Sequence, residues 1–145
     1  MFLNLSISVW SWAIFGRELS LEKTTALFFV RLVYVGSIFV PPLFLHFVDS
    51  LLRLAKRKIV LFLYVVSVIF LIFDFTPLFI NDVGPILSFR YYGIPGIIYP
   101  FFASSFIITI TYSHYLLVKY YSRVEGQKRN QILYLLLASI IGFLG

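Results

Sequence analysis

The sequence has no cysteine and few side chains that carry chemistry. Its 145 residues include two histidines, six acidic residues and one methionine. The lack of cysteine excludes disulfides, thiolate metal sites and a cysteine nucleophile. No HExxH, GxSxG, P-loop or dinucleotide-binding pattern occurs in the sequence. We therefore predict no catalytic residue, metal site or cofactor, and we do not expect an enzyme.

Charge is scarce as well. Only 12% of the residues are charged, whereas 61% are hydrophobic and 20% aromatic. A soluble domain is about a quarter charged and about half apolar. So short a chain cannot enclose the surplus in its own core, so its solvent must be lipid. The composition predicts an all-α, multi-pass transmembrane bundle.

Polar residues divide the chain into five apolar segments, near residues 2–15, 28–52, 59–73, 97–118 and 132–145. A spanning helix needs about 20 apolar residues. The second and fourth segments reach this length, and the third does so if it continues through Asp74 and Pro77 to Ile80. The first and last are shorter, and we interpret them as clipped spans of a single domain, residues 1–145, that is a fragment without a soluble part. A signal peptide is the alternative for the first segment, but it lacks a basic start and a small-residue cleavage site.

Basic residues predict the orientation. Eight of the twelve lie in two connections, after the second and the fourth segment: Arg53, Lys56, Arg57, Lys58, Lys119, Arg123, Lys128 and Arg129. In an antiparallel bundle these connections share one side, and an excess of Lys and Arg marks the cytoplasmic side. We expect loops 53–58 and 119–129 in the cytoplasm, loop 76–96 outside, and the domain in the cell membrane. Binding of anionic lipid or nucleic acid is a rarer reason for such clusters.

The second segment carries four polar residues that are costly in a membrane helix: Arg31, His46, Asp49 and Arg53. Arg31 and Arg53 bracket an apolar stretch of about 30 Å and can reach the two headgroup layers. Asp49 and Arg53 are four residues apart, so they can pair on a helix, and His46 lies on the same stripe. We regard the four residues as a candidate polar relay, with end anchoring as the simpler role.

Pro41 and Pro42 stand in the middle of the same segment. Each proline lacks a backbone N–H, so the carbonyl one turn earlier loses its donor. The two carbonyls freed in this way are those of Ser37 and Ile38. Lipid offers no donor, so we expect Ser67, or Ser104 or Ser105, to supply one. The prolines, together with Gly36, form a candidate hinge; a static kink that improves packing is the alternative.

The two histidines, His46 and His114, precede their basic clusters by similar distances and could share one depth on neighbouring helices. Haem or metal ligation by the pair is an alternative that the lack of carboxylates at ligand spacing disfavours.

The stretch from residue 76 to residue 100 predicts a small external hairpin or loop. Residues 78–83 and 86–92 are rich in β-branched and aromatic side chains, and Asn-Asp and Gly-Pro pairs at 81–82 and 84–85 favour turns. Its tyrosines suit an aromatic belt at the membrane interface. A lid over a ligand is the sharper hypothesis, with five candidate sensing residues: Asn81, Asp82, Arg90, Tyr91 and Tyr92.

Several of these features together resemble a known family. They are the acidic and polar stretch before Phe28 and Phe29, then Arg31, the mid-helix Pro42 followed by His46-Phe47, and "QKRNQILYLL" before the glycines near the end. The chain resembles the N-terminal seven-helix sensor region of prokaryotic histidine kinases and some diguanylate cyclases. The resemblance implies one helix before the first segment and a further helix leading to a cytoplasmic output domain. It also implies that His46 is not the phosphoacceptor.

We therefore expect a sensory input domain of a signal-transduction protein. Its expected partners are the lipid bilayer, a missing cytoplasmic output domain, an external ligand and a second copy in a homodimer, but no nucleic acid. A small multi-pass transporter or channel subunit is the alternative. Ser104, Ser105, Thr109 and Thr111 are too scattered to favour a polar path through the bundle.

Overall fold

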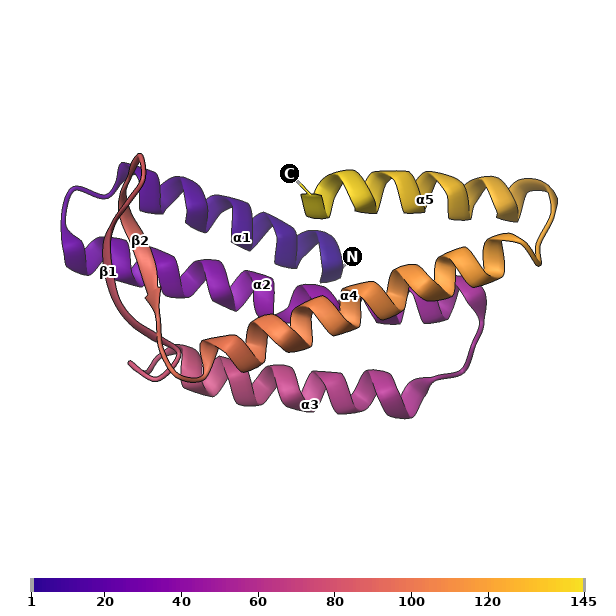
Figure 1. The fold of residues 1–145 in the computed structure, drawn as a ribbon, viewed down its shortest axis with the longest axis horizontal. Coiled ribbons are helices and arrows are strands. Elements are labelled where there is room, and N and C mark those ends of the chain that lie inside the picture. The colour runs from indigo at the N-terminus through magenta and orange to yellow at the C-terminus, as the bar shows by residue number, and fades with distance from the viewer. Residues whose placement is uncertain (1, 145) are drawn as a thin grey trace.

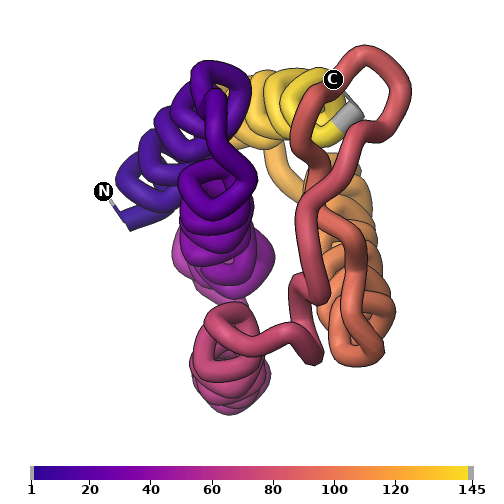
Figure 2. The backbone as a smooth tube through the Cα atoms, turned by 90° about the vertical axis from the view of Figure 1, so that its left-hand side faces the viewer, coloured from indigo at the N-terminus to yellow at the C-terminus, as the bar shows by residue number. Residues whose placement is uncertain are grey.

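The structure, a computed structural model, describes residues 2–144. Its elements in chain order are α1 (Phe2–Leu19), α2 (Lys23–Leu52), α3 (Arg57–Asp74), β1 (Ile80–Ile86), β2 (Phe89–Pro95), α4 (Tyr99–Tyr121) and α5 (Gly126–Leu144). The helices run along one long axis, and the hairpin covers one end (Figure 1). Viewed along that axis, α1, α2 and α3 form a column with the hairpin and α4 beside it (Figure 2). Each of the five predicted segments is helical over most of its length.

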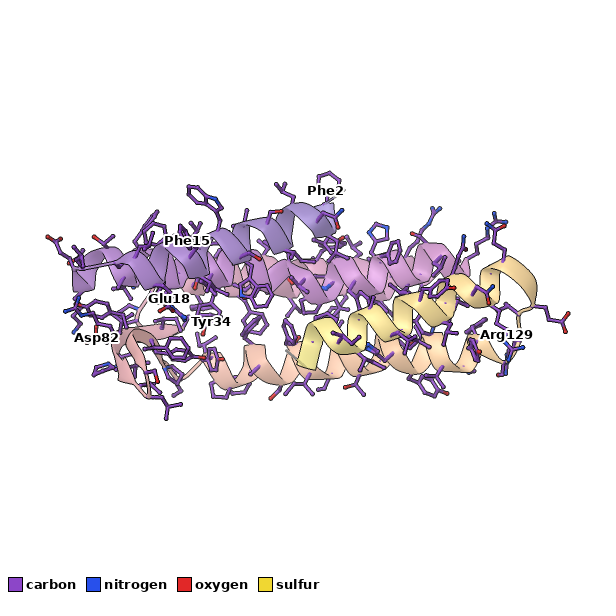
Figure 3. The ribbon with its side chains drawn as sticks, turned by 90° about the horizontal axis from the view of Figure 1, so that it is seen from above. Phe2, Phe15, Glu18, Tyr34, Asp82 and Arg129 are labelled. Carbon is purple, nitrogen blue, oxygen red and sulfur yellow. The ribbon has the colours of Figure 1, made fainter. Side chains whose placement is uncertain are left out.

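The basic connections lie together, at the end of the bundle opposite the hairpin (Figure 1). Figure 3 shows Asp82 of the hairpin and Arg129 of α5 at opposite ends of the long axis. This arrangement confirms that the two basic connections lie at the same end of the bundle. Two helices, α2 and α4, are long and apolar enough to cross a membrane. Apolar side chains of α3 also face outward, among them Leu61, Phe62, Val65 and Ile72.

Helix α3 ends earlier than the longest predicted span. The Thr76 N–H and hydroxyl both donate to the Phe73 carbonyl, at 2.9 and 2.7 Å. Pro77 disfavours helical geometry at the residue before it, so the helix stops at Asp74. The predicted continuation to Ile80 is wrong, because Ile80 begins strand β1 instead.

Helix α2 continues through both prolines, from Lys23 to Leu52. The Ser67 hydroxyl of α3 donates to the Ile38 carbonyl at 3.1 Å. This carbonyl is the one that Pro42 frees, so the prediction that Ser67 supplies a donor is confirmed. The alternative donor Ser104 bonds the Pro100 carbonyl of its own helix, at 2.8 Å.

Two hydrophobic clusters form the core, one at each end of the bundle. The cluster near the hairpin is built around Val30, Ile38, Phe79, Ile80 and Phe102. The cluster near the basic connections contains Phe44, Leu45, Val48, Leu117, Ile132 and Leu136. On α2 the first cluster ends at Ile38 and the second begins at Phe44. Pro41 and Pro42 are buried between them.

The predicted hairpin exists, but its turn lies elsewhere. β1 and β2 pair antiparallel, with Ile86 opposite Phe89, so the turn is formed by Leu87 and Ser88. Leu87 has a φ of 53°, as a tight hairpin turn requires. Asn81-Asp82 and Gly84-Pro85, predicted as turns, lie within β1 next to two register shifts. The bulges accommodate these residues because the extra residue of a bulge does not join the ladder.

Candidate functional site

A cavity of about 600 Å³ lies beneath the hairpin. Helices α1, α2 and α4 and strand β2 contribute its walls, which include Trp10, Ile14, Tyr34, Tyr92, Tyr99 and Phe102. Strand β2 can cover the cavity closely because residue 93 is glycine. A Cβ at this position would lie 2.9 Å from the Val30 Cγ1 atom. The volume lies within the range of small-molecule pockets, and the lining is mainly apolar and aromatic, as is common in such sites.

Arg17 stands at the rim of this cavity. Its guanidinium carbon lies 5.3 Å from the ring centroids of both Phe89 and Tyr92, which places the cation between two strand β2 rings. The guanidinium is also paired with the neighbouring Glu18. Cation–π contacts of this kind contribute about 0.5–1 kcal/mol each at exposed sites. Arg17 therefore connects α1 to the hairpin and places an ion pair at the edge of an apolar cavity.

Two further contacts attach the hairpin to the start of α2 and to the segment before it. The Lys23 ammonium donates to Asp82 Oδ2 at 2.6 Å, and the Tyr91 hydroxyl donates to the Leu21 carbonyl at 3.3 Å. The Lys23 hydrogen bond, aided by the Val83 N–H, holds the pKa of the Asp82 carboxyl below its usual value. Both attachments are exposed to solvent, so changes at the surface can loosen the cover without disturbing the core.

Aromatic rings form the floor of the cavity. The Tyr34 ring on α2 meets Phe79, Tyr99 and Phe102 edge-on, with centroids 5.4 to 6.0 Å apart. Figure 3 shows Tyr34 on the side of α2 that faces the hairpin. Ser37, one turn further along α2, also lines the cavity. Since Pro41 frees the Ser37 carbonyl, the cavity reaches the proline segment itself.

Arg31 and Asp74 lie level with each other on the antiparallel helices α2 and α3. Arg31 comes seven residues before Ile38, and Asp74 comes seven residues after Ser67, the hydrogen-bond partner of Ile38. Both therefore lie on the hairpin side of that bond. Arg31 Nε and both Asp74 carboxylate oxygens are buried, without a hydrogen-bond partner among residues 2–144. Arg31 thus differs from a simple headgroup anchor, because its Nε is enclosed by protein.

The four residues of the predicted relay do not meet at one place. His46, Asp49 and Arg53 line a single cavity at the far end of α2, whereas Arg31 lies near the hairpin. The predicted pairing of Asp49 with Arg53 is wrong for this structure. Arg53 adopts a left-handed conformation just after the helix, with φ 54° and ψ 46°. Asp49 Oδ1 instead accepts the Lys56 N–H at 2.9 Å.

The two histidines have different partners, on different helices. His46 Nδ1 lies 3.1 Å from the Tyr64 hydroxyl on α3. His114 Nε2 lies 2.9 Å from the Ser139 hydroxyl on α5, and its ring packs on Phe44. Residues 2–144 contain no group of three side chains placed to hold a metal ion. The geometry offers no support for joint ligation by the histidines.

Gly36, predicted as part of the hinge, makes the closest helix contact in the proline region. A Cβ there would lie 2.6 Å from the Trp10 backbone nitrogen, and the Ser6 hydroxyl donates to the Gly36 carbonyl at 2.6 Å. Small residues at such crossings let helix backbones approach in membranes. The glycine is therefore first of all a packing residue between α1 and α2.

Of the five predicted sensing residues, only Tyr92 lines the cavity. Asp82 and Tyr91 attach the hairpin, while Asn81 and Arg90 are exposed on its outer surface. The prediction missed the contribution of α1, namely Trp10, Ile14 and Arg17, and of the α4 start, Tyr99 and Phe102. For the α4 residues the available signal was their aromatic character directly after the predicted hairpin; the sequence offered no such signal for α1.

A family model described as the N-terminal 7TM region of histidine kinase matches residues 1–145. The chain belongs to this family. As a histidine kinase 7TM region it is a membrane domain from the sensor part of such kinases, consistent with its two long apolar helices. No curated protein and no solved structure matches the chain significantly.

Proposed function

We propose that this histidine kinase 7TM region is the sensory input domain of its kinase, and that the cavity beneath the hairpin takes the stimulus. The walls suit a small apolar or aromatic molecule. The single observation that carries the proposal is the position of Ser37. It lines the cavity and is the residue whose carbonyl Pro41 frees.

Occupation of the cavity would bend α2 at the prolines. The two hydrophobic clusters lie on either side of Pro41 and Pro42, so each half of α2 is held by its own packed group. Packed groups move as units, and a bend between them has two discrete arrangements rather than a continuum. The half of α2 after the prolines, which packs on Leu117 of α4, would carry the change to the end with the basic connections.

The topology follows from the charges. We infer that the five helices span the membrane and that the hairpin lies outside. The connections at 53–58 and 119–129 would then face the cytoplasm, where an output domain would receive the signal. A transporter or channel subunit is a weaker candidate, because two serine side chains of α4 bond within their own helix instead of lining a polar path. Ser104 and Ser113 donate to carbonyls four residues earlier.

The test uses the full-length kinase and its output activity against stimulus, with membrane abundance measured beside it. Ala103→Trp fills the cavity with a side chain from α4, and Ile108→Trp is the matched control, since Ile108 is 68% exposed on the same helix. We expect the first variant to lose its response and the second to keep it. A normal response in Ala103→Trp at normal abundance would exclude the cavity as the sensing site.

The hinge is tested separately. Replacing Pro41 and Pro42 with alanine restores two backbone donors and removes the preference for a bend. We expect stability to hold or rise, and output to stay at one level whatever the stimulus. His46→Ala should change the response less. A stimulus response like that of the unaltered protein in the double alanine variant would leave the prolines as packing features only.

A further inference from the structure

A second cavity lies at the other end of the bundle, between the end of α2 and the start of α3. Its volume is about 730 Å³, and Arg53, Arg57, His46 and Tyr64 contribute polar groups to its walls. The guanidinium groups of Arg53 and Arg57 are not in ion pairs with any acidic residue of the described chain. Guanidinium groups bind phosphate strongly, because their planar donors match its oxygens.

One acidic residue, Asp49, also lines this cavity, but its carboxylate is already engaged. It is 8% exposed and accepts the Lys56 N–H, which fixes the turn between the helices. The Lys56 ammonium is turned to the Tyr112 hydroxyl of α4, and this hydrogen bond raises the pKa of Lys56. This hydrogen bond orients the Asp49 carboxylate but leaves its charge, so the two arginines give the cavity a net positive charge.

An apolar groove continues from this cavity toward the middle of the bundle. Its volume is about 520 Å³, and it shares His46 and Tyr64 with the basic cavity. Leu5, Val9, Val35, Phe39 and Leu43 line the rest, from α1 and α2. The α2 stretch from Val35 to His46 measures about 16 Å at the helical rise. That length is close to one leaflet of hydrocarbon, about half of the 30 Å core.

From this geometry we infer a binding site for one anionic phospholipid, independent of the cavity beneath the hairpin. The phosphate headgroup lies between Arg53 and Arg57, the His46 and Tyr64 side chains mark the level of the glycerol, and an acyl chain fills the groove. Basic pockets at the ends of membrane helices bind such headgroups. A soluble anion would fill only the basic half, whereas a lipid fills both halves.

The site also adjoins the prolines. Phe39 and Leu43 are two residues before Pro41 and one residue after Pro42, and both line the groove. A bound acyl chain would lie against the segment that the proposed function requires to bend. Lipid binding itself does not depend on that function and is measured without it.

The experiment measures lipid binding to the purified full-length protein in detergent. Phosphatidylglycerol and phosphatidylcholine with the same acyl chains are titrated, and bound lipid is counted by native mass spectrometry. Near a membrane surface each basic residue contributes about fivefold in affinity. We expect phosphatidylglycerol to bind about thirtyfold more weakly to the Arg53→Gln, Arg57→Gln variant. Both arginines are exposed, so the fold should survive.

The matched control is Lys58→Gln with Lys128→Gln, which removes two charges at the same end of the bundle without touching the cavity. Its affinity should stay within about twofold of the parent. An equal loss of phosphatidylglycerol affinity in the two double variants would show that general surface charge, and not this site, binds the lipid. If phosphatidylcholine bound the parent protein as tightly as phosphatidylglycerol, the proposed selectivity for an anionic headgroup would be refuted.

Two further arms separate lipid from free phosphate. Leu43→Trp fills the groove but leaves both arginines, so it should weaken phosphatidylglycerol binding and leave inorganic phosphate unaffected. Inorganic phosphate should compete with the lipid only poorly. Full competition at comparable concentration, or unchanged lipid binding by Leu43→Trp, would show an anion site without a lipid.

Discussion

The hydrogen bond from Ser67 to the Ile38 carbonyl should be needed only because residue 42 is proline. Ser67→Ala removes the donor and leaves a buried carbonyl without a partner. Hydrogen bonds between membrane helices contribute about 0.6 kcal/mol on average and up to about 1.7. An unsatisfied buried carbonyl adds to this loss, so we expect a cost of about 1 kcal/mol in the free energy of unfolding.

In a Pro42→Ala background the same substitution should cost almost nothing. Residue 42 then has an N–H that donates to the Ile38 carbonyl within α2, so the carbonyl no longer depends on Ser67. The coupling between the two substitutions is therefore about 1 kcal/mol, although the side chain of Pro42 is not itself the acceptor. Equilibrium unfolding in mixed micelles measures all four corners of the cycle.

Ser104→Ala is the control for loss of a hydroxyl. Ser104 bonds the Pro100 carbonyl of its own helix, which residue 104 already reaches through its N–H. Its removal should cost at most a few tenths of a kcal/mol in either background. An equal cost of Ser67→Ala in the parent and in the Pro42→Ala background would refute the reasoning, since the hydroxyl would then act independently of the proline.

Three other outcomes are expected. Reporter fusions after Lys58 should read cytoplasmic and fusions after Gly84 external; the opposite pattern would invert the topology. Gly36→Ala should reduce the thermal midpoint by several degrees and loosen α1, because the new Cβ meets the α1 backbone at 2.6 Å; an unchanged midpoint would contradict this packing. The folded pKa of Asp82 is lowered, so its link to α2 stabilises above the unfolded pKa and is lost as pH falls below about 4. The stability difference between the parent and Asp82→Asn should therefore decrease as the pH falls through the folded pKa, and a difference that stays constant in acid would assign the effect to another group.

The helices and the polarity of the bundle could be predicted because their causes are local. Runs of apolar residues define the helices, and the basic residues mark one end. The role of Ser67 was also predictable. The carbonyl that needs a donor is the one four residues before the proline. Consecutive helices pack antiparallel, so the donor must come from a residue at the same depth on the next helix.

The predictions were wrong where residues distant in the sequence determine the hydrogen-bond partner or the strand register. Asp49 and Arg53 have helical spacing, but α2 ends between them, and the Lys56 N–H is a better partner for the carboxylate. The hairpin turn lies at Leu87-Ser88 and not at Gly84-Pro85, between the two predicted strands, because β1 packs against the aromatic core through Ile80 and Val83. The residues of α1 in the cavity could not be foreseen, since nothing in the sequence states which helix packs beside the hairpin.

Helix α2 contacts α1, α3, α4 and both strands, whereas α5 packs mainly on α4 and reaches α2 through side chains such as Phe143. This difference predicts how the sequences of related domains should diverge. A change of side-chain volume on α2 must be accommodated by several neighbours at once, so its residues should vary slowly, and insertions there should be rare. Residues of α5 have fewer protein neighbours than those of α2. Their sequence should vary faster, above all on the face of α5 that meets lipid.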